Sequence, residues 1–281
     1  MAENNQAKAA PAEPVVKASL AGLPMRPLRV LVASSLGTAG KSTISENVVL
    51  PGLGAKRIYA VESPNVEPTE YAVPVEMFAA DDLPEMRRLI MKDTDPVAVD
   101  LGASDFGSFV EALFSANLFP MFDYCVLVGH PSDRGQAAVV GTYQTIRKFG
   151  MPDHKFRVVL NRVVMNARKR EAAVLAQFPF LFAFAKQNPG FWINPECVVP
   201  EFATLFTQLK DAGRSLAEVL ADQTDYEDLA YTLSCAGDEA GADDACKRGV
   251  VAQYAIGAQA YFERAYKLLD LRPKKTAHAG S

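Results

Sequence analysis

The sequence predicts an α/β fold in which a mainly parallel β-sheet is flanked by helices. Short apolar runs rich in β-branched residues alternate with segments of helical period, and such alternation is typical of parallel sheets. Polar side chains follow directly after several of these runs, where the carboxyl ends of parallel strands bind ligands. Of 281 residues, 49% are hydrophobic and 22% are charged, which suffices for the core of one large domain.

The expected elements follow one another along the chain. The first strand covers residues 29–34, and a helix starts beyond the next loop, at 42–50. Further strands are expected at 57–62, 97–101, 124–129, 156–161 and 197–199. Helical periodicity occupies 83–91, 106–116 and 136–149, and a long pattern at 250–271 predicts a helical C-terminal part.

The most specific motif lies between the first strand and the helix after it. It consists of Gly37, Thr38, Ala39, Gly40, Lys41, Ser42 and Thr43. In such a loop the backbone N–H groups form an anion cradle, the lysine reaches the β- and γ-phosphates, and the following hydroxyl can ligate Mg²⁺. Ser35 stands where the full P-loop pattern has glycine, so the match is partial. The strand–loop–helix context favours a nucleoside triphosphate site over a surface turn.

Further candidate residues stand where other predicted strands end. Glu62 ends the second strand, and Asp100 lies near the end of the third. His130 follows the fourth strand, Asn161 ends the fifth, and Arg162 comes directly after it. A carboxylate at the position of Asp100 could hold a Mg²⁺-bound water, or it could cap the next helix. His130 lies in no triad-like motif, so loop packing or a switch-loop contact is expected rather than base catalysis.

These residues together resemble the ParA/MinD-type P-loop ATPases, whose loop has the form Lys-Gly-Gly-x-Gly-Lys-Thr-Thr. Residues 37–43 lie on that motif, and Asp100 lies on the family's Walker-B-like strand end. Asn161 and Arg162 lie on its strand-end Asn-Arg pair, and Pro200 with Glu201 looks like the later strand end that lines the base pocket. The resemblance spans about residues 28–219.

The resemblance implies a SIMIBI/ParA-like fold with ATP and Mg²⁺ as ligands. Lys41 would neutralise the phosphates, Ser42 and Asp100 would hold the metal, and Asn161 would select adenine. It also implies exchange of ATP and ADP, a small DNA-binding partner protein and a nucleotide-dependent homodimer.

Two positions depart from the family pattern. Leu36 stands where the family has the signature lysine that reaches the phosphates of the partner in a nucleotide-sandwich dimer. Ser63 stands where the family has the aspartate that orients the attacking water. Glu62 could act as a catalytic substitute from one position away, although a shift of one residue redirects a side chain at a strand end. The expected ATP hydrolysis is therefore slow or stimulated by a partner.

Within the family, residues 34–40 and 61–65 look most like the plasmid stability and transfer branch, the StbB-like proteins. This implies a nucleotide switch in plasmid stability, positioning or conjugative transfer. Two other functions stay open: a metabolic phosphate-transferring ligase of the same fold class, and a non-hydrolysing nucleotide-binding scaffold.

Charge and composition restrict the partners and the compartment. The net charge of −4 gives no global electrostatic signal for nucleic acid, so direct sequence-specific DNA binding is not expected. The sequence shows neither a signal-peptide pattern nor an apolar run of membrane length, which predicts a cytoplasmic protein. Residues 1–27 and 272–281 are expected to be a flexible leader and tail around one ATPase domain at 28–271.

Four cysteines lack the spacing of a zinc site and are expected to be buried thiols. They are Cys125, Cys197, Cys235 and Cys246. An aromatic cluster at 178–184 and 191–192 favours the core over a partner surface. The helix at 250–271 is expected to pack on the sheet rather than on a membrane, because Glu263 and Asp270 weaken attraction to anionic lipid. Residues 238–244 predict a solvated acidic loop.

Overall fold

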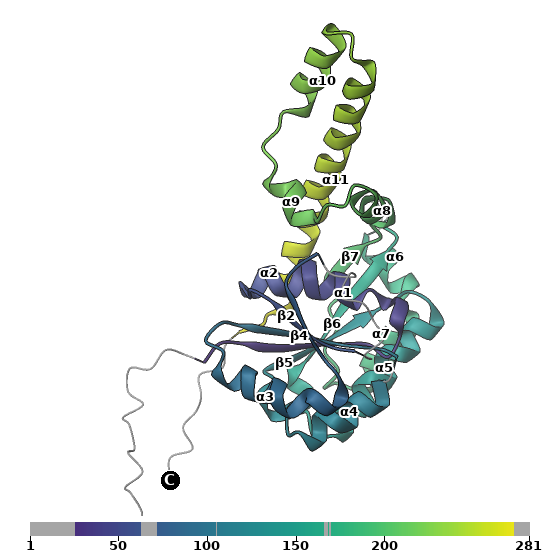
Figure 1. The fold of residues 1–281 in the computed structure, drawn as a ribbon. Coiled ribbons are helices and arrows are strands. Elements are labelled where there is room, and N and C mark those ends of the chain that lie inside the picture. The colour runs from purple at the N-terminus through teal and green to yellow at the C-terminus, as the bar shows by residue number, and fades with distance from the viewer. Residues whose placement is uncertain (1–25, 63–71, 105, 166–167, 169, 273–281) are drawn as a thin grey trace, which may run out of the picture.

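The computed structural model describes residues 26–62, 72–104, 106–165, 168 and 170–272. Its centre is a seven-stranded sheet in the order β3-β2-β4-β1-β5-β6-β7, and every neighbouring pair of strands is parallel. The strands are β1 (Arg29–Ala33), β2 (Ile58–Val61), β3 (Val75–Phe78), β4 (Val97–Leu101), β5 (Tyr124–Gly129), β6 (Phe156–Val163) and β7 (Val198–Pro200). Helices cover the sheet (Figure 1), which confirms the predicted fold class.

The described helices begin directly after β1. They are η1 (Gly37–Ala39), α1 (Lys41–Ile44), η2 (Ser45–Val49), α2 (Leu50–Leu53), η4 (Ala80–Asp82), α3 (Leu83–Lys92), α4 (Phe106–Ser115), η5 (Phe119–Met121), α5 (Asp133–Lys148), η6 (Asp153–Lys155), α6 (Arg170–Gln177), α7 (Pro179–Gln187), α8 (Ala203–Asp211), α9 (Leu216–Ala221), α10 (Tyr226–Cys235) and α11 (Glu239–Leu269). Successive segments α1, η2 and α2 form one continuous helical stretch, and its middle part η2 is a π-helix.

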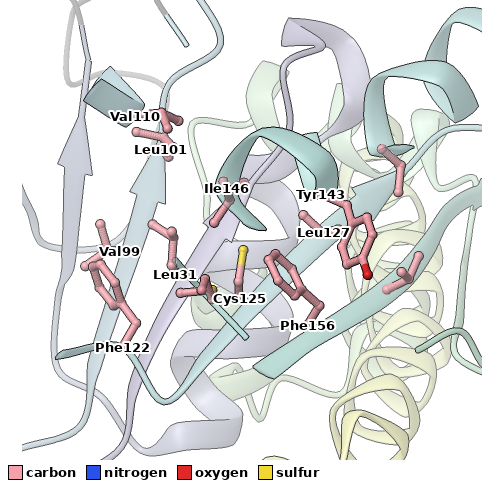
Figure 2. Close-up of a cluster of buried hydrophobic side chains, with 14 of the residues drawn as sticks. Leu31, Val99, Leu101, Val110, Phe122, Cys125, Leu127, Tyr143, Ile146 and Phe156 are labelled. Atoms are coloured by element: carbon pink, nitrogen blue, oxygen red, sulfur yellow. The ribbon is translucent and has the colours of Figure 1, made fainter. Parts of the chain in front are cut away.

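The two faces of the sheet bury different side chains because the side-chain direction alternates along each strand. On one face, Leu31 of β1 packs with residues of α3, α4, α5 and α7 in a large core that Figure 2 shows in part. On the other face, Val30 and Val32 pack with α1, η2, α8, α9 and the C-terminal half of α11. Strands β1, β2, β4 and β5 are buried throughout, as expected for a parallel sheet covered on both sides.

Most predicted elements are present with small shifts at their ends, but one strand was not predicted. β3 is a short edge strand in which Val75, Glu76 and Met77 are only half-buried. It therefore lacks the continuous apolar run by which the inner strands are recognised.

The predicted acidic loop at 238–244 is wrong, because these residues start helix α11. The Asp238 side chain accepts a hydrogen bond from the Gly241 N–H and so caps the helix, which begins at Glu239. Carboxylates stabilise a helix N-terminus by capping and through its dipole, which explains why an acidic run starts a helix here. Asp243 and Asp244 are nevertheless exposed.

The prediction of buried thiols is correct for two cysteines and wrong for the other two. Cys125 and Cys197 are buried in the sheet region, and burial raises the pKa of the Cys197 thiol to about 12. Cys235 and Cys246 are exposed on α10 and α11. Both belong to helices that pack over only part of their surface, which the sequence pattern did not reveal.

The aromatic cluster contributes to the core, as predicted. Phe178, Leu181 and Phe191 are buried, whereas Phe180 is 48% exposed. The C-terminal half of α11 also packs as predicted, since Phe262 and Leu269 are buried against the sheet-side core. Within the described part of the chain, no helix is long and apolar enough to cross a membrane.

Arg157 on β6 holds the end of α11 against the sheet. Its guanidinium lies 4.8 Å from the ring centroid of Tyr124 and 5.1 Å from that of Trp192. Its Nε also donates a hydrogen bond of 2.8 Å to the Leu269 carbonyl. A cation between two rings that also binds a helix C-terminus stabilises the junction between α11 and the domain.

We expect Arg157→Ala to lower the free energy of unfolding by about 2 to 3 kcal/mol, because it removes the two ring contacts and the bond to Leu269. Urea unfolding measures the change. The control is Arg248→Ala, which removes an exposed ion pair with Asp244 on the same helix and should cost under about 0.5 kcal/mol. Equal losses for both variants would contradict the assigned role.

Candidate phosphate- and nucleotide-binding site

The loop after β1 is held in place by its own first residues. The Ser34 hydroxyl accepts a hydrogen bond from the Leu36 N–H at 3.2 Å, and the Ser35 N–H donates to the Thr142 hydroxyl on α5 at 3.0 Å. The Leu36 side chain is half-buried and packs against the core. The start of the loop is therefore fixed between the sheet and α5.

The loop ends at the N-terminus of α1, and no side chain caps this helix. Gly40 precedes the helix with a φ of 83°, a left-handed conformation that glycine adopts at low cost. The first N–H groups of a helix have no partner within the helix, and its dipole attracts negative charge. The end of α1 is therefore suited to bind an anion.

Lys41, the first residue of α1, supplies a buried positive charge at the same point. The residue is only 5% exposed. Within the described residues, its side chain takes part in no ion pair or hydrogen bond. Because a buried charge is costly without a partner, the pocket is electrostatically complementary to an anionic ligand.

Asn161, near the end of β6, lies directly over the loop. It is 3% exposed, and its Nδ2 donates a hydrogen bond of 2.8 Å to the Ala39 carbonyl. A Cβ atom at Gly40 would collide with this Nδ2, so the close approach requires glycine. An amide group has two N–H hydrogens and one oxygen, so Asn161 retains a donor and an acceptor for a further partner.

Arg162 follows in a strained backbone conformation. Its φ is 54°, in the left-handed region that residues with a side chain seldom adopt. Such strain is frequent at functional sites, where the surrounding structure enforces it. Arg162 lines both of the cavities beside the loop.

A cavity of about 350 Å³ beside the loop brings five of the predicted residues together. Asn161, Arg162, Pro200 and Glu201 line it together with Thr43 of α1. The other lining residues are Val199, Phe202, Ala203, Phe206, Thr207 and Lys210. The pocket thus has apolar walls and several polar groups, as small-molecule sites do.

Several lining residues were missed by the sequence analysis, and three of them lie on one helix face. Phe202, Phe206 and Lys210 recur every four positions from the start of α8 onward, so they share one helix face. Their four-residue spacing after Pro200, where the strand ends, could have indicated that they line the pocket. An adjoining cleft of about 1030 Å³ shares Arg162, Phe206 and Lys210 and extends to Ser42.

The acidic candidates lie at the same edge of the sheet. Asp100 is 1% exposed on β4 and pairs in register with Val32 of β1, close to the loop that leads to Lys41. Its expected alternative role as a helix cap is wrong, because Asp100 lies within β4 and α4 begins only at Phe106. Glu62 follows β2, and its carboxylate occupies the space that a side chain at Gly102 would need.

These residues fit a magnesium ion that is bound together with a ligand. A hydroxyl such as Ser42 and a buried carboxylate such as Asp100 are oxygen ligands that Mg²⁺ accepts, with phosphate oxygens and waters completing its shell. No group of three or more His, Cys, Asp or Glu side chains among the described residues could hold a metal by itself. Ser63 lies outside the described residues, so the prediction for it remains untested.

His130 has a structural role at the start of α5. Its Nδ1 accepts a hydrogen bond of 3.2 Å from the Ser132 N–H, and Ser132 caps the helix by accepting from the Gly135 N–H. Burial, helped by Arg162 and opposed by Glu201, lowers the pKa of His130. The lowered pKa favours the neutral imidazole, which packs the loop, one of the roles expected for it.

Comparisons with known proteins show similarity to solved structures. No protein family model matches the sequence, and no curated protein matches it. A ParA family ATPase from Chlorobium tepidum TLS is 12% identical with a TM-score of 0.48, covering 82% of this chain and 99% of that chain. Cyanothece apo McdA is 16% identical with a TM-score of 0.46, covering 78% and 99%.

The MinD cell division protein of Aquifex aeolicus is 14% identical with a TM-score of 0.46, covering 82% of this chain and 97% of that chain. At such identities the likeness concerns the fold alone. The site described above is argued from the residues of this chain.

Proposed function

We propose that this chain binds ATP with Mg²⁺ at the loop between β1 and α1. The observation that carries the proposal is Lys41, a buried cation that forms no ion pair or hydrogen bond among the described residues, at a helix N-terminus without a side-chain cap. Triphosphate oxygens would supply a counter-charge and accept from the N–H groups of the loop. Ser42 and Asp100 would hold the Mg²⁺, which neutralises phosphate charge when bound.

The base would occupy the cavity of about 350 Å³ next to the loop. Pro200 and Phe206 offer apolar surface there, and the remaining donor and acceptor of Asn161 match an adenine edge. Asn161 also holds the loop through the Ala39 carbonyl. Its side chain would thereby connect the base pocket to the phosphate loop.

We further propose a slow nucleotide switch that a partner stimulates. Leu36 packs against the core and carries no charge that could stabilise a transferring phosphoryl group across a dimer. Glu62 remains the candidate for positioning water. The resemblance of the sequence motifs supports a finer assignment. The chain would be a cytoplasmic switch in plasmid stability, positioning or conjugative transfer. It would act with a small DNA-binding partner and with a nucleotide-dependent second copy.

One observation favours a second candidate function. The cleft of about 1030 Å³ that reaches Ser42 has room for another substrate beside the nucleotide, as a phosphate-transferring ligase would require. Phosphate release that depends on an added small acid or amine would favour the ligase over the switch.

Calorimetry and steady-state phosphate release test the proposal. We expect ATP to bind more tightly than GTP, and we expect Asn161→Ala to reduce this preference, because the amide supplies the base contacts. Turnover by the protein alone should stay well below the range of about 1 to 100 s⁻¹ of active phosphoryl-transfer enzymes. Equal affinity for ATP and GTP would exclude the base assignment, and fast turnover without a partner would exclude the switch.

A further inference from the structure

A cavity of about 710 Å³ lies where α11 packs against η2, α2 and α9. Figure 1 shows α11 passing α2 and α9 where it reaches the body of the domain. Among the described residues, none lines both this cavity and the cavity of about 350 Å³ beside Asn161. The two cavities are therefore separate sites.

The walls of the cavity are mostly apolar and belong to the packed core. Val48, Leu50, Leu216 and Phe262 are buried core residues that line it, and Val73, Leu220 and Tyr266 pack against the same core. A Cβ atom at Gly52 would collide with the Tyr266 ring, so this ring lies directly against the backbone of α2. The walls are thus fixed by close packing, as in a preformed small-molecule pocket.

Glu46 of η2 brings a half-buried carboxylate to this cavity. Its Oε1 accepts a hydrogen bond of 3.0 Å from the Ala72 N–H. Within the described residues, Glu46 forms no ion pair, and its second oxygen accepts no hydrogen bond. Burial raises the pKa of Glu46, and the bond from Ala72 only partly opposes this effect. The carboxylate therefore retains an acceptor that a cationic donor would stabilise.

Two further charged side chains line the cavity, and both come from α11. Glu263 accepts a hydrogen bond of 3.0 Å from Gln259, and Lys267 follows one turn later. Both are exposed, so water screens them more than it screens Glu46. Two carboxylates and one ammonium give the lining a balance of −1. The charge of the cavity favours a cation over an anion.

The size and the walls of the cavity restrict the ligand further. Small-molecule pockets have volumes of about 300 to 1,000 Å³ and apolar walls with a few polar groups. The apolar walls favour a hydrocarbon chain or a ring, because its burial removes apolar surface from water. A protonated amine on such a body would form a charge-assisted hydrogen bond with Glu46, which is strengthened where water is excluded.

We propose that this cavity binds a small amine, a molecule with an apolar body and a protonated amino group. The body packs against Leu220 and Tyr266, and the amino group donates to the carboxylate of Glu46. The site requires no bound nucleotide, so the proposal does not rest on the proposed function.

The test measures binding of the full chain to three probes that share one apolar body: phenylbutylamine, phenylbutanol and phenylbutyrate. Calorimetry at neutral pH keeps the amine protonated. The amine should bind at least about tenfold tighter than the alcohol, and the acid should bind most weakly. Glu46→Gln keeps an acceptor for the Ala72 N–H but removes the charge. It should abolish the difference between amine and alcohol and leave the affinity for the alcohol unchanged.

A second pair of variants tests the location of the site. Ala217 and Ala221 are exposed residues of α9 that line the cavity. Ala217→Trp and Ala221→Trp each place a large side chain in it and should abolish binding of the amine. The matched control is Ala240→Trp, an exposed position in the first turn of α11 outside the lining, which should bind the amine like the wild type. Urea unfolding checks that each variant is folded, and two filling variants guard against loss of one fold.

Several results would overturn the proposal. Failure of the amine to bind at millimolar concentration would exclude the site. Equal affinities for the three probes, or a preference for the amine that survives Glu46→Gln, would exclude the assigned ligand class. Unchanged binding in folded Ala217→Trp or Ala221→Trp would place the amine elsewhere. Displacement of the amine by ATP in direct competition would place it in the nucleotide site.

Discussion

Lys41→Ala is expected to weaken ATP binding by about 3 kcal/mol, roughly a hundredfold in Kd, because it removes a buried charge that contacts the phosphates. The free energy of unfolding without nucleotide should fall by no more than about 1 kcal/mol, since a buried cation without a partner contributes little to stability. Calorimetry measures the first change and urea unfolding measures the second.

The control for this variant is Lys148→Ala, which removes an exposed lysine at the far end of α5. It should change neither ATP affinity nor stability. The phosphate-loop assignment is wrong if Lys41→Ala binds ATP as tightly as the wild type. A loss of several kcal/mol of stability without nucleotide would instead show that Lys41 is a structural residue.

The inner part of the fold could be predicted because burial leaves a strong sequence signal. β1, β4 and β5 are buried along their whole length and appear in the sequence as continuous apolar runs. The N-terminal half of α11 has no such signal. Its first residues are acidic, alanine or glycine, and they pack only against α10, so no wide apolar stripe marks them.

The candidate site also has a part that the sequence predicts and a part that it does not. Asp100 and Asn161 could be predicted because strand ends of a parallel sheet share one edge. The hydrogen bond from Asn161 to the Ala39 carbonyl could not be predicted, because it depends on the left-handed backbone of Gly40 and on how β6 lies beside the loop. Phe206 and Lys210 come from α8, whose position over the pocket is set by packing rather than by local sequence.

Gly40 and Asn161 can be tested as a pair, because the glycine is required for two separable reasons. Its φ of 83° disfavours a side chain, and a Cβ would also collide with the Asn161 amide. A substitution of Gly54 tests the backbone strain alone, since the φ of Gly54 is 67° and a Cβ there would meet nothing within 4 Å. The two glycines therefore form a matched comparison of conformational strain with and without a collision.

We expect Gly40→Ala to destabilise the protein by about 3 kcal/mol and Gly54→Ala by about 1 kcal/mol, because only the first change adds a collision to the strain. In a protein that already carries Asn161→Ala, Gly40→Ala should cost only about 1 kcal/mol, since the colliding amide is gone. Urea unfolding of the four variants measures this coupling. If Gly40→Ala and Gly54→Ala cost the same, or if Asn161→Ala leaves the cost of Gly40→Ala unchanged, Asn161 does not hold the phosphate loop. ATP affinity, measured on the same proteins, should fall most in Gly40→Ala, because displacing the loop misplaces the N–H groups that precede Lys41.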